Sequence, residues 1–393
     1  MKLIGPTYQP TQPAHVGTRR AFTKFVFTHG HARNVPFGSA LEEPIPRMKL
    51  AVVTTSWWAQ WENWQPNTDI PGPICVAEDA LLYHEWLKGF TPGTEKKVLR
   101  HNVVLKLTAR TTYEILNRAK KCGFYVVKIY PDGVTTNSEG GWSSLTELYP
   151  AIQSAVELGF IVMFHGEQPG EDIDTYAREI VFMEKSFKQV AKDFAGANLD
   201  VQHISCKRTL EMVGEMPANI TGGLTIHHLI LTRNDVLEWK KGKRRGMNPH
   251  NHCRPPAQQF HDRDALLYAA LHADETAYRK FHLGPDSAPH HTHDKECDCG
   301  CAGLCTSPNA GPVLVELYEN NDRLDHPSFH AFTIGNGARI FNVQVDPSQT
   351  FTLEKGLWAV PEKYGGVTPF WAGRELQWKP IEPMALNPSL LLS

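Results

Sequence analysis

Apolar runs that alternate with helical patterns constrain the fold of this 393-residue chain more than any other feature. Most of these short runs, rich in β-branched and aromatic residues, are followed by a stretch in which apolar residues recur with the helical period. Strands that alternate with helices pair in parallel, and eight such units predict a single (β/α)8 barrel, an α/β fold of the TIM type. The runs are KFVFTHGH (24–31), KLAVVTT (49–55), NVVLKLT (102–108), YVVKIY (125–130), GFIVMFHGE (159–167), NLDVQHIS (198–205), ITGGLTIHHL (220–229) and KFHLGPDSAPH (280–290).

Polar side chains follow several of these runs at the point where the apolar residues end. In a barrel of parallel strands the carboxyl ends form the active-site face, so side chains distant in sequence meet there. Each one alone has a simpler interpretation, because a buried histidine or lysine is more often a satisfied core group than a ligand. Their recurrence at the same end of successive strands indicates a shared site. The residues are His29, His31, Lys128, His165, His203 and Asp286.

Lys128 is the most informative of these residues. A lysine at the end of an apolar strand should lose its charge or find an anion, because desolvation disfavours the ammonium form. A neutral amine can react with carbon dioxide, and the two oxygens of the resulting carbamate can bridge two metal ions. From Lys128 alone, a simple pairing with a nearby carboxylate remains the favoured alternative.

The other strand-end residues supply ligands for two metal ions. His29, His31 and Asp286 can complete the shell of one ion, while His165 and His203 can complete the shell of the other. Imidazole and carboxylate ligands suit zinc, and Mn²⁺ or Co²⁺ would also fit. Such a pair polarises a carbonyl group and activates water, which leaves Asp286 to move a proton between water and a leaving nitrogen. The predicted reaction is hydrolysis, or the reverse closure, of an amide-like bond.

Composition excludes several other classes of protein. The formal net charge of -2 gives no broad electrostatic reason for a nucleic-acid or membrane partner. Hydrophobic residues make up 41% of the chain, without an apolar run near the roughly 20 residues that a membrane helix needs. Residues 1–23 are expected to form an irregular, proline-containing extension, and because they lack the apolar core of a secretory signal we expect a cytoplasmic protein.

Several motifs together resemble the dihydroorotases of the amidohydrolase superfamily, in particular the single-function type. The resemblance extends from about residue 24 to residue 380, which leaves 381–393 as a tail. The segments KIYPDGVTTNS and GPDSAPH are highly specific, whereas QHIS by itself is not. The matching segments are HGHAR (29–33), QPNT (65–68), KIYPDGVTTNS (128–138), FHGE (164–167), QHIS (202–205), GPDSAPH (284–290), CGCAG (299–303) and TPFWAGRELQW (368–378).

This resemblance implies a reaction and a role for each matching residue. The reaction is the reversible cyclisation of N-carbamoyl-L-aspartate to (S)-dihydroorotate in pyrimidine biosynthesis, catalysed by a homodimer. Carboxylated Lys128, formed with CO2, would bridge two Zn²⁺ ions held by the residues named above, and Asp286 would be the acid and base. The implied substrate contacts are Arg33, Asn67 and His290 to the α-carboxylate, the backbone of Arg254 and Ala302 to the ring edge, and the loop threonines Thr135 and Thr136.

The sequence departs from the family pattern around the substrate and not at the metal ligands. Thr28 and Asn34 flank the first histidine motif where other residue types are usual, and Arg254 stands where the family has an apolar residue. A tryptophan-rich segment, WWAQWENW (57–64), has the character of an insertion. These changes concern the shape of the substrate pocket.

Three alternatives remain open on the sequence. Cys297, Cys299, Cys301 and Cys305 are close enough in sequence to hold a structural zinc, although the C-x-C-x-C spacing is unlike the usual C-x-x-C knuckle. A related cyclic amidohydrolase, hydantoinase-like or allantoinase-like, would share the metal ligands. A non-catalytic dihydroorotase-like scaffold normally loses ligands, whereas all the expected positions are filled here. His227 and His228 are interpreted as packed or hydrogen-bonded histidines.

Overall fold

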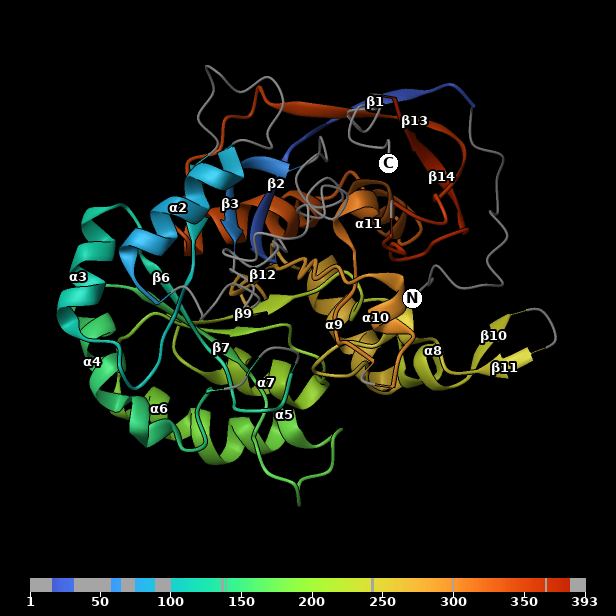
Figure 1. Cartoon of the computed structure of the whole chain (residues 1–393). Coiled ribbons are helices and arrows are strands. Elements are labelled where there is room, and N and C mark those ends of the chain that lie inside the picture. The colour runs from blue at the N-terminus through green and yellow to red at the C-terminus, as the bar shows by residue number, and fades with distance from the viewer. Residues whose placement is uncertain are drawn as a thin grey trace, which may run out of the picture.

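Parallel strands surrounded by helices make up most of the computed structural model (Figure 1). The structure describes residues 16–31, 58–64, 75–88, 100–135, 138, 140–241, 244–298, 300–364 and 366–381. Short runs of buried Val, Ile and Phe form the strands, as β-branched and aromatic residues favour. The parallel strands are β2 (Phe25–Gly30), β3 (Trp58–Trp64), β4 (Arg100–Val103), β5 (Leu105–Lys106), β6 (Val126–Ile129), β7 (Ile161–His165), β8 (Leu199–Gln202), β9 (Ile220–Leu224) and β12 (Phe281–Leu283).

These strands follow one another around a barrel. One ladder has the order β2-β3-β4 and the other has the order β12-β9-β8-β7-β6-β5. Only Val104 separates β4 from β5, so the two ladders adjoin there. At the other junction Gly30 bridges Ser287 in parallel, and Asp286 N donates to His29 O at 2.9 Å. The predicted α/β barrel architecture is therefore confirmed, although the ladder of strand hydrogen bonds is not continuous around the ring.

The second strand of the barrel differs from its prediction. The run 49–55, predicted to form it, lies outside the described residues. The strand between β2 and β4 is β3, which falls in the tryptophan-rich segment interpreted as an insertion; Phe25 pairs with Trp58, and Trp61 pairs with Arg100. Aromatic residues are strand formers, and residues 58–64 pair with both neighbouring strands of the sheet.

Helices cover the outside of the strands (Figure 1). Thr112 caps α3 by accepting a hydrogen bond from Ile115 N at 3.4 Å, and Gly123, with φ of 92°, lies just past its carboxyl end. The helices are α2 (Ala77–Lys88), α3 (Tyr113–Lys121), α4 (Tyr149–Glu157), α5 (Arg178–Val181), α6 (Lys188–Asp193), α7 (Lys207–Glu215), α8 (Arg233–Leu237), α9 (Phe260–Leu271), α10 (Thr292–Lys295), α11 (Ala310–Glu319), α12 (Pro327–His330) and α13 (Asn336–Ile340), with short 3-10 or π segments at Leu145–Leu148, Phe182–Phe187, Pro249–Asn251, Ser307–Asn309 and Ala331–Gly335.

Two smaller antiparallel sheets lie beside the barrel strands. The strands β1 (Arg19–Thr23), β13 (Thr350–Ala359) and β14 (Glu375–Pro380) form one sheet, and β10 (Trp239–Lys241) pairs with β11 (Arg244–Gly246) in the other. The expected irregular extension over residues 1–23 thus contains a regular strand at its end. Apart from Ile381, the expected tail 381–393 lies outside the described residues. Within the described part of the chain, none of the helices has the length and apolarity needed to cross a membrane.

Candidate active site

Lys128 lies fully buried near the end of β6, with about 1% of its surface exposed. Its Nζ has no hydrogen-bond partner among the described residues, and it lies 5.7 Å from the centre of the Tyr130 ring. Burial lowers the pKa of Lys128 to about 7, against the attraction of Asp286 and Asp200, which raise it. Lys128 therefore has a substantial neutral fraction near pH 7, so it can react as an amine.

His29, His31 and Asp286 converge at the junction of β2 and β12. Asp286 Oδ1 lies 3.2 Å from His29 Nε2 and 3.5 Å from His31 Nε2. Burial lowers the pKa of His29 well below its usual value. Burial also opposes ionisation of Asp286, but the neighbouring imidazoles, His29 first, hold its pKa well below the usual range. A carboxylate beside two imidazoles is a donor set that suits a divalent cation.

His165 and His203 form the other half of the cluster. Their ring centres are 4.5 Å apart, and the ring centre of His203 is 5.5 Å from that of His29. Burial lowers the pKa of both His165 and His203, so both rings are neutral near pH 7. Lys128 also acts electrostatically on His29, His165 and His203, which places it among them. All six residues predicted as ligands therefore lie together.

The backbone at two of these residues is in an unfavourable conformation. His203 and Asp286, which follow β8 and β12, each have φ of 43°, in the left-handed region that non-glycine residues rarely adopt. Such conformations persist only where the surrounding structure enforces them, and they cluster at functional sites. Both are positions at which the chain turns out of a strand and towards the cluster.

The orphaned polar atoms show that this donor set fits metal ions. His29 Nδ1, His203 Nδ1 and Lys128 Nζ are buried without a hydrogen-bond partner among the described residues. Buried polar groups normally have partners, because each one left unsatisfied costs about 1–3 kcal/mol. A cation held by the cluster, together with a carbamate on Lys128, would engage the nitrogen atoms of His203 and Lys128 that protein atoms leave free, whereas His29 faces Asp286 with Nε2.

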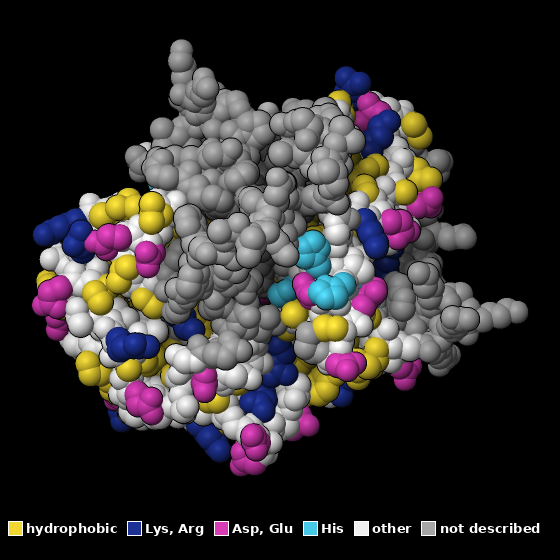
Figure 2. Space-filling model, in the orientation of Figure 1, with side chains coloured by type: hydrophobic (Ala, Val, Ile, Leu, Met, Phe, Trp, Pro, Cys, Tyr) yellow, Lys and Arg dark blue, Asp and Glu magenta, His cyan; other side chains and the backbone are white. Residues whose placement is uncertain are grey.

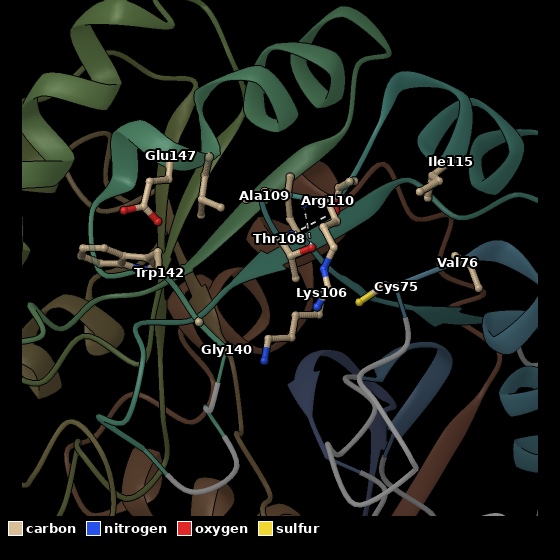
Figure 3. Close-up of a pocket in the computed structure, with 14 residues that line it drawn as sticks. Cys75, Val76, Lys106, Thr108, Ala109, Arg110, Ile115, Gly140, Trp142 and Glu147 are labelled. Atoms are coloured by element: carbon tan, nitrogen blue, oxygen red, sulfur yellow. Dashed lines mark hydrogen bonds between the residues drawn. The ribbon is translucent and has the colours of Figure 1, made fainter.

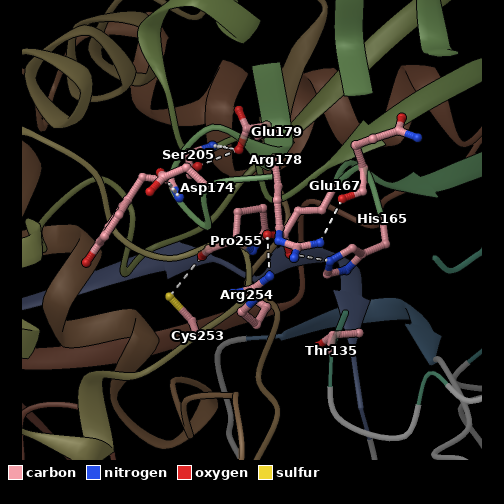
Figure 4. Close-up of polar contacts among 12 residues, drawn as sticks. Thr135, His165, Glu167, Asp174, Arg178, Glu179, Ser205, Cys253, Arg254 and Pro255 are labelled. Carbon is pink, nitrogen blue, oxygen red and sulfur yellow. Dashed lines mark hydrogen bonds and ion pairs between the residues drawn. The ribbon is translucent and has the colours of Figure 1, made fainter. Parts of the chain in front are cut away.

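Glu167 contacts His165 and was not predicted as a site residue, although it belongs to the FHGE segment. It is fully buried, its Oε2 accepts a hydrogen bond from His165 Nε2 at 2.7 Å, and its Oε1 lies 3.1 Å from Arg254 Nη2 (Figure 4). The bond to Glu167 leaves Nδ1 as the nitrogen of His165 that can bind a metal. The sequence could have indicated Glu167, because it lies two residues after His165 at the end of a predicted strand.

Of the predicted substrate-binding residues, Arg33, Asn67 and Thr136 lie outside the described residues. Thr135 is described, and its N–H donates to Ser138 Oγ at 3.1 Å, while Ser138 Oγ donates to Thr135 O at 2.7 Å. These two bonds fold the start of the loop onto itself. The structure places Thr135 at the carboxyl side of β6, beyond Lys128.

His290 and Ala302 contact each other, since His290 Nε2 donates to Ala302 O at 3.0 Å. Gly303 makes this close packing possible. It has φ of 141°, and a Cβ at this position would lie 2.6 Å from Ala288 O. The segments 286–290 and 300–303, both part of the predicted site, are therefore packed together.

Lys295, at the end of α10, connects two of the predicted substrate-binding segments. Its side chain is buried, and its Nζ donates to the carbonyl oxygens of His252 at 2.9 Å, Cys301 at 2.7 Å and Gly303 at 2.8 Å. His252 precedes Arg254, while Cys301 and Gly303 flank Ala302. One ammonium group thus holds both backbone segments, a role that no sequence motif indicated.

A cavity of about 420 Å³ lies beside the end of β5 (Figure 3). Lys106 and Trp142 contribute to its wall. Lys106 pairs in register with Lys128, and its Nζ lies 5.8 Å from the ring centre of Tyr130, the ring that Lys128 also approaches. The cavity has the volume of a small-molecule site, and none of the six cluster residues is among the described residues of its wall. Figure 2 shows histidine side chains gathered near the middle of one face of the molecule.

The cysteine cluster does not form a metal site in the described part of the chain. The groups of His, Cys, Asp and Glu found there with mutually close ligand atoms are His29, His31 and Asp286, and His227, His228 and Cys253. Cys297 Sγ instead donates to Asp294 O at 3.2 Å, and Cys299 lies outside the described residues.

In the group His227, His228 and Cys253, two side chains already have a hydrogen-bond partner in the protein. His228 Nε2 and Cys253 Sγ both donate to Pro255 O, at 3.0 and 3.2 Å. His227 is fully buried, and neither of its ring nitrogens has a hydrogen-bond partner among the described residues. The interpretation of His228 as a hydrogen-bonded histidine is confirmed.

An α/β barrel with imidazoles, a carboxylate and a buried lysine at the ends of its strands defines a metal-dependent hydrolase of the amidohydrolase type. No family model matches the chain. The chain is 34% identical to a dihydroorotase of Shewanella oneidensis over 313 residues, which cover 78% of this chain and 87% of that relative. It is 35% identical to a dihydroorotase of Photobacterium profundum over 314 residues, or 79% of this chain and 87% of that relative. The chain belongs to the dihydroorotase family.

Solved structures agree with this assignment. The crystal structure of a dihydroorotase from Campylobacter jejuni superposes with a TM-score of 0.76 at 26% identity, covering 94% of this chain and 99% of that one. An L-hydantoinase from Arthrobacter aurescens shares the fold alone, with a TM-score of 0.67 at 15% identity over 92% of this chain and 83% of that one. The sequence resemblance to dihydroorotases is confirmed.

Proposed function

We propose that this chain performs the dihydroorotase reaction, the interconversion of (S)-dihydroorotate with N-carbamoyl-L-aspartate, at a binuclear metal centre bridged by carboxylated Lys128. The observation that carries the proposal is the buried Nζ of Lys128, which lacks a hydrogen-bond partner among the described residues while lying among three imidazoles and Asp286. Hydrolysis of a cyclic amide follows from membership of the family. The metal ligands and the residue roles are our proposal.

In the proposed centre His29, His31 and Asp286 hold one ion, and His165 and His203 hold the other. The ions are Zn²⁺, although Co²⁺ or Mn²⁺ suits the same ligands. Bound divalent cations would supply Lewis acidity towards the substrate carbonyl and would lower the pKa of water. Lys128 would contribute both oxygens of its carbamate after reaction with CO2, which needs the neutral amine that burial favours.

Asp286 would move the proton in both directions. In hydrolysis its carboxylate accepts a proton from the attacking water and returns it to the ring nitrogen as the C–N bond breaks. In cyclisation it accepts a proton from the attacking carbamoyl nitrogen and donates it to the departing oxygen, which releases water. Its lowered pKa is consistent with a carboxylate that begins the hydrolytic direction as the base.

The substrate would be held by residues around this centre. Arg33, Asn67 and His290 would bind the α-carboxylate, a role that suits a guanidinium fork and an amide donor. The backbone of Arg254 and Ala302 would contact the ring edge, and Thr135 and Thr136 would close over the open-chain form. We further propose a homodimer, which sedimentation at several protein concentrations would test.

Activity towards a panel of cyclic amides tests the proposal. The protein is reconstituted with Zn²⁺ in bicarbonate and assayed with dihydroorotate, N-carbamoyl-L-aspartate, hydantoin and allantoin, with Lys128→Ala as the inactive control. We expect turnover of the first two compounds to exceed that of the others by orders of magnitude. Faster turnover of hydantoin or allantoin would assign another cyclic amidohydrolase activity, and no turnover of any compound would support the scaffold alternative.

A further inference from the structure

Arg254 and Glu167 form a buried ion pair directly behind a proposed metal ligand. Glu167 is fully buried, and 13% of the Arg254 side chain is exposed. Their closest atoms, Glu167 Oε1 and Arg254 Nη2, are 3.1 Å apart. Because Glu167 Oε1 has no hydrogen-bond partner among the described residues, this ion pair is its compensating contact. A buried carboxylate without a counter-charge would be costly, so the two side chains depend on each other.

The other oxygen of Glu167 reaches the metal cluster. Its Oε2 accepts the hydrogen bond from His165 Nε2 at 2.7 Å, which fixes both the tautomer and the ring orientation of His165 (Figure 4). The three side chains therefore form a chain of contacts from Arg254 through Glu167 to His165. Mutation of a carboxylate that orients a metal-binding histidine typically costs about 10–100-fold in metal affinity.

We propose that Arg254 is a positioning residue for the metal centre. Its guanidinium holds the Glu167 carboxylate in place, and Glu167 in turn holds His165 with Nδ1 directed to the metal. This inference rests on the proposed function, in which His165 is a metal ligand. It assigns the side chain of Arg254 a role separate from the substrate contact proposed for its backbone.

A competing explanation is that the guanidinium acts on the substrate ring. The two explanations differ in what Glu167 contributes. If Arg254 acts through Glu167, its removal should matter only while residue 167 is glutamate. If it acts on the substrate, its removal should have the same effect whether residue 167 is Glu or Gln. Non-additivity in a double-mutant cycle therefore separates them.

The test is a Zn²⁺ affinity cycle with four proteins: wild type, Arg254→Met, Glu167→Gln and the double variant. Met approximates the length of the arginine stem, and Gln retains an oxygen that can accept from His165. Zn²⁺ dissociation constants are measured by competition with a chromophoric chelator, without substrate. We expect Arg254→Met to weaken Zn²⁺ binding by about 10–100-fold and the double variant to be no weaker than Glu167→Gln.

Arg178 provides a matched control. It is a nearby arginine whose guanidinium donates to the carbonyl oxygens of Gln168 at 2.9 Å and Gly170 at 2.6 Å and not to Glu167. Arg178→Met should retain wild-type Zn²⁺ affinity even if it lowers the melting temperature. Arg254→Lys, which retains the charge, should recover part of the affinity lost in Arg254→Met, and it provides a folded variant if the methionine variant fails to fold.

Two results would overturn the inference. One is wild-type Zn²⁺ affinity in Arg254→Met accompanied by a raised KM. The other is fully additive losses in the cycle, which is run with Arg254→Lys if Arg254→Met fails to fold. A separate variant distinguishes failure of the proposed function. If His165→Ala binds Zn²⁺ with wild-type stoichiometry and affinity, His165 is not a ligand and the proposed centre itself is wrong. If His165→Ala loses metal while Arg254→Met does not, only the role of Arg254 is refuted.

Discussion

Replacing Lys295 with methionine should weaken both the fold and substrate binding. Lys295 Nζ makes three hydrogen bonds of 2.7 to 2.9 Å to the carbonyl groups of His252, Cys301 and Gly303. A hydrogen bond to a charged group contributes about 1.5–3 kcal/mol, so three would contribute about 4.5–9 kcal/mol. Burial of the Lys295 ammonium costs several kcal/mol, which offsets part of this stabilisation. The methionine variant has no charge to bury and does not incur this cost. The expected net loss is about 2–4 kcal/mol.

Urea unfolding and steady-state kinetics measure the two consequences of this change. The midpoint should fall at an unchanged m-value, which would show a loss of stability without a change in the unfolded state. KM for dihydroorotate should rise about tenfold, or about 1.4 kcal/mol, because the segments around Arg254 and Ala302 lose their common anchor. A variant with reduced stability and an unchanged KM would refute the reasoning that these two segments bind substrate.

Lys280 offers a closely matched control. Its Nζ also donates to three carbonyl groups, those of Val213, Met216 and Pro217, at 2.7, 2.6 and 3.1 Å. It directly precedes β12, at the end of the strand opposite Asp286. Lys280→Met should therefore lower stability and leave KM unchanged. The loss of stability should be smaller than in Lys295→Met, because Lys280 is only partly buried. An equal rise in KM would show that the effect at Lys295 is not specific to the site.

Two further predictions concern a catalytic group and a buried carboxyl group. Asp286→Ala should retain measurable substrate binding while hydrolysis and cyclisation both collapse; loss of one direction alone would contradict a single acid and base. Burial raises the pKa of Glu316 to about 7. Folding therefore favours its protonated form, and stability relative to Glu316→Gln should fall by about 3 kcal/mol as the pH rises from 4.5 to 7. Parallel urea-unfolding curves for both proteins across this range would show the difference, and a constant difference would contradict it.

The fold and the metal cluster follow from regularities that the sequence displays. The buried strands carry near-continuous apolar runs, and a polar residue that ends such a run must lie at the carboxyl face of the barrel. His165 and Lys128 could be placed in this way without knowledge of any contact. The second strand escaped prediction because β3 carries a charged residue, Glu62, among its aromatic residues and lacks the apolar run.

The supporting contacts could not be predicted in the same way. Glu167 and Arg254 are 87 positions apart, on two loops whose approach depends on the complete barrel. A lysine at the end of a short helix is expected at the surface. Only in the folded protein do the neighbouring loops surround the Lys295 ammonium with carbonyl groups. The left-handed backbone of His203 and Asp286 is enforced by tertiary packing and not by residue type.

A carbamate on Lys128 is the central claim, and isotope labelling tests it most directly. The protein is depleted of metal, reconstituted with Zn²⁺ in ¹³C-bicarbonate and studied by ¹³C NMR, with zinc counted in the same sample. We predict one carbamate carbon and two zinc ions per chain in the wild type. In Lys128→Ala the carbamate signal should be absent and turnover abolished, with partial recovery on addition of a short carboxylic acid. A fully active wild type that holds two zinc ions without a carbamate signal would contradict the account.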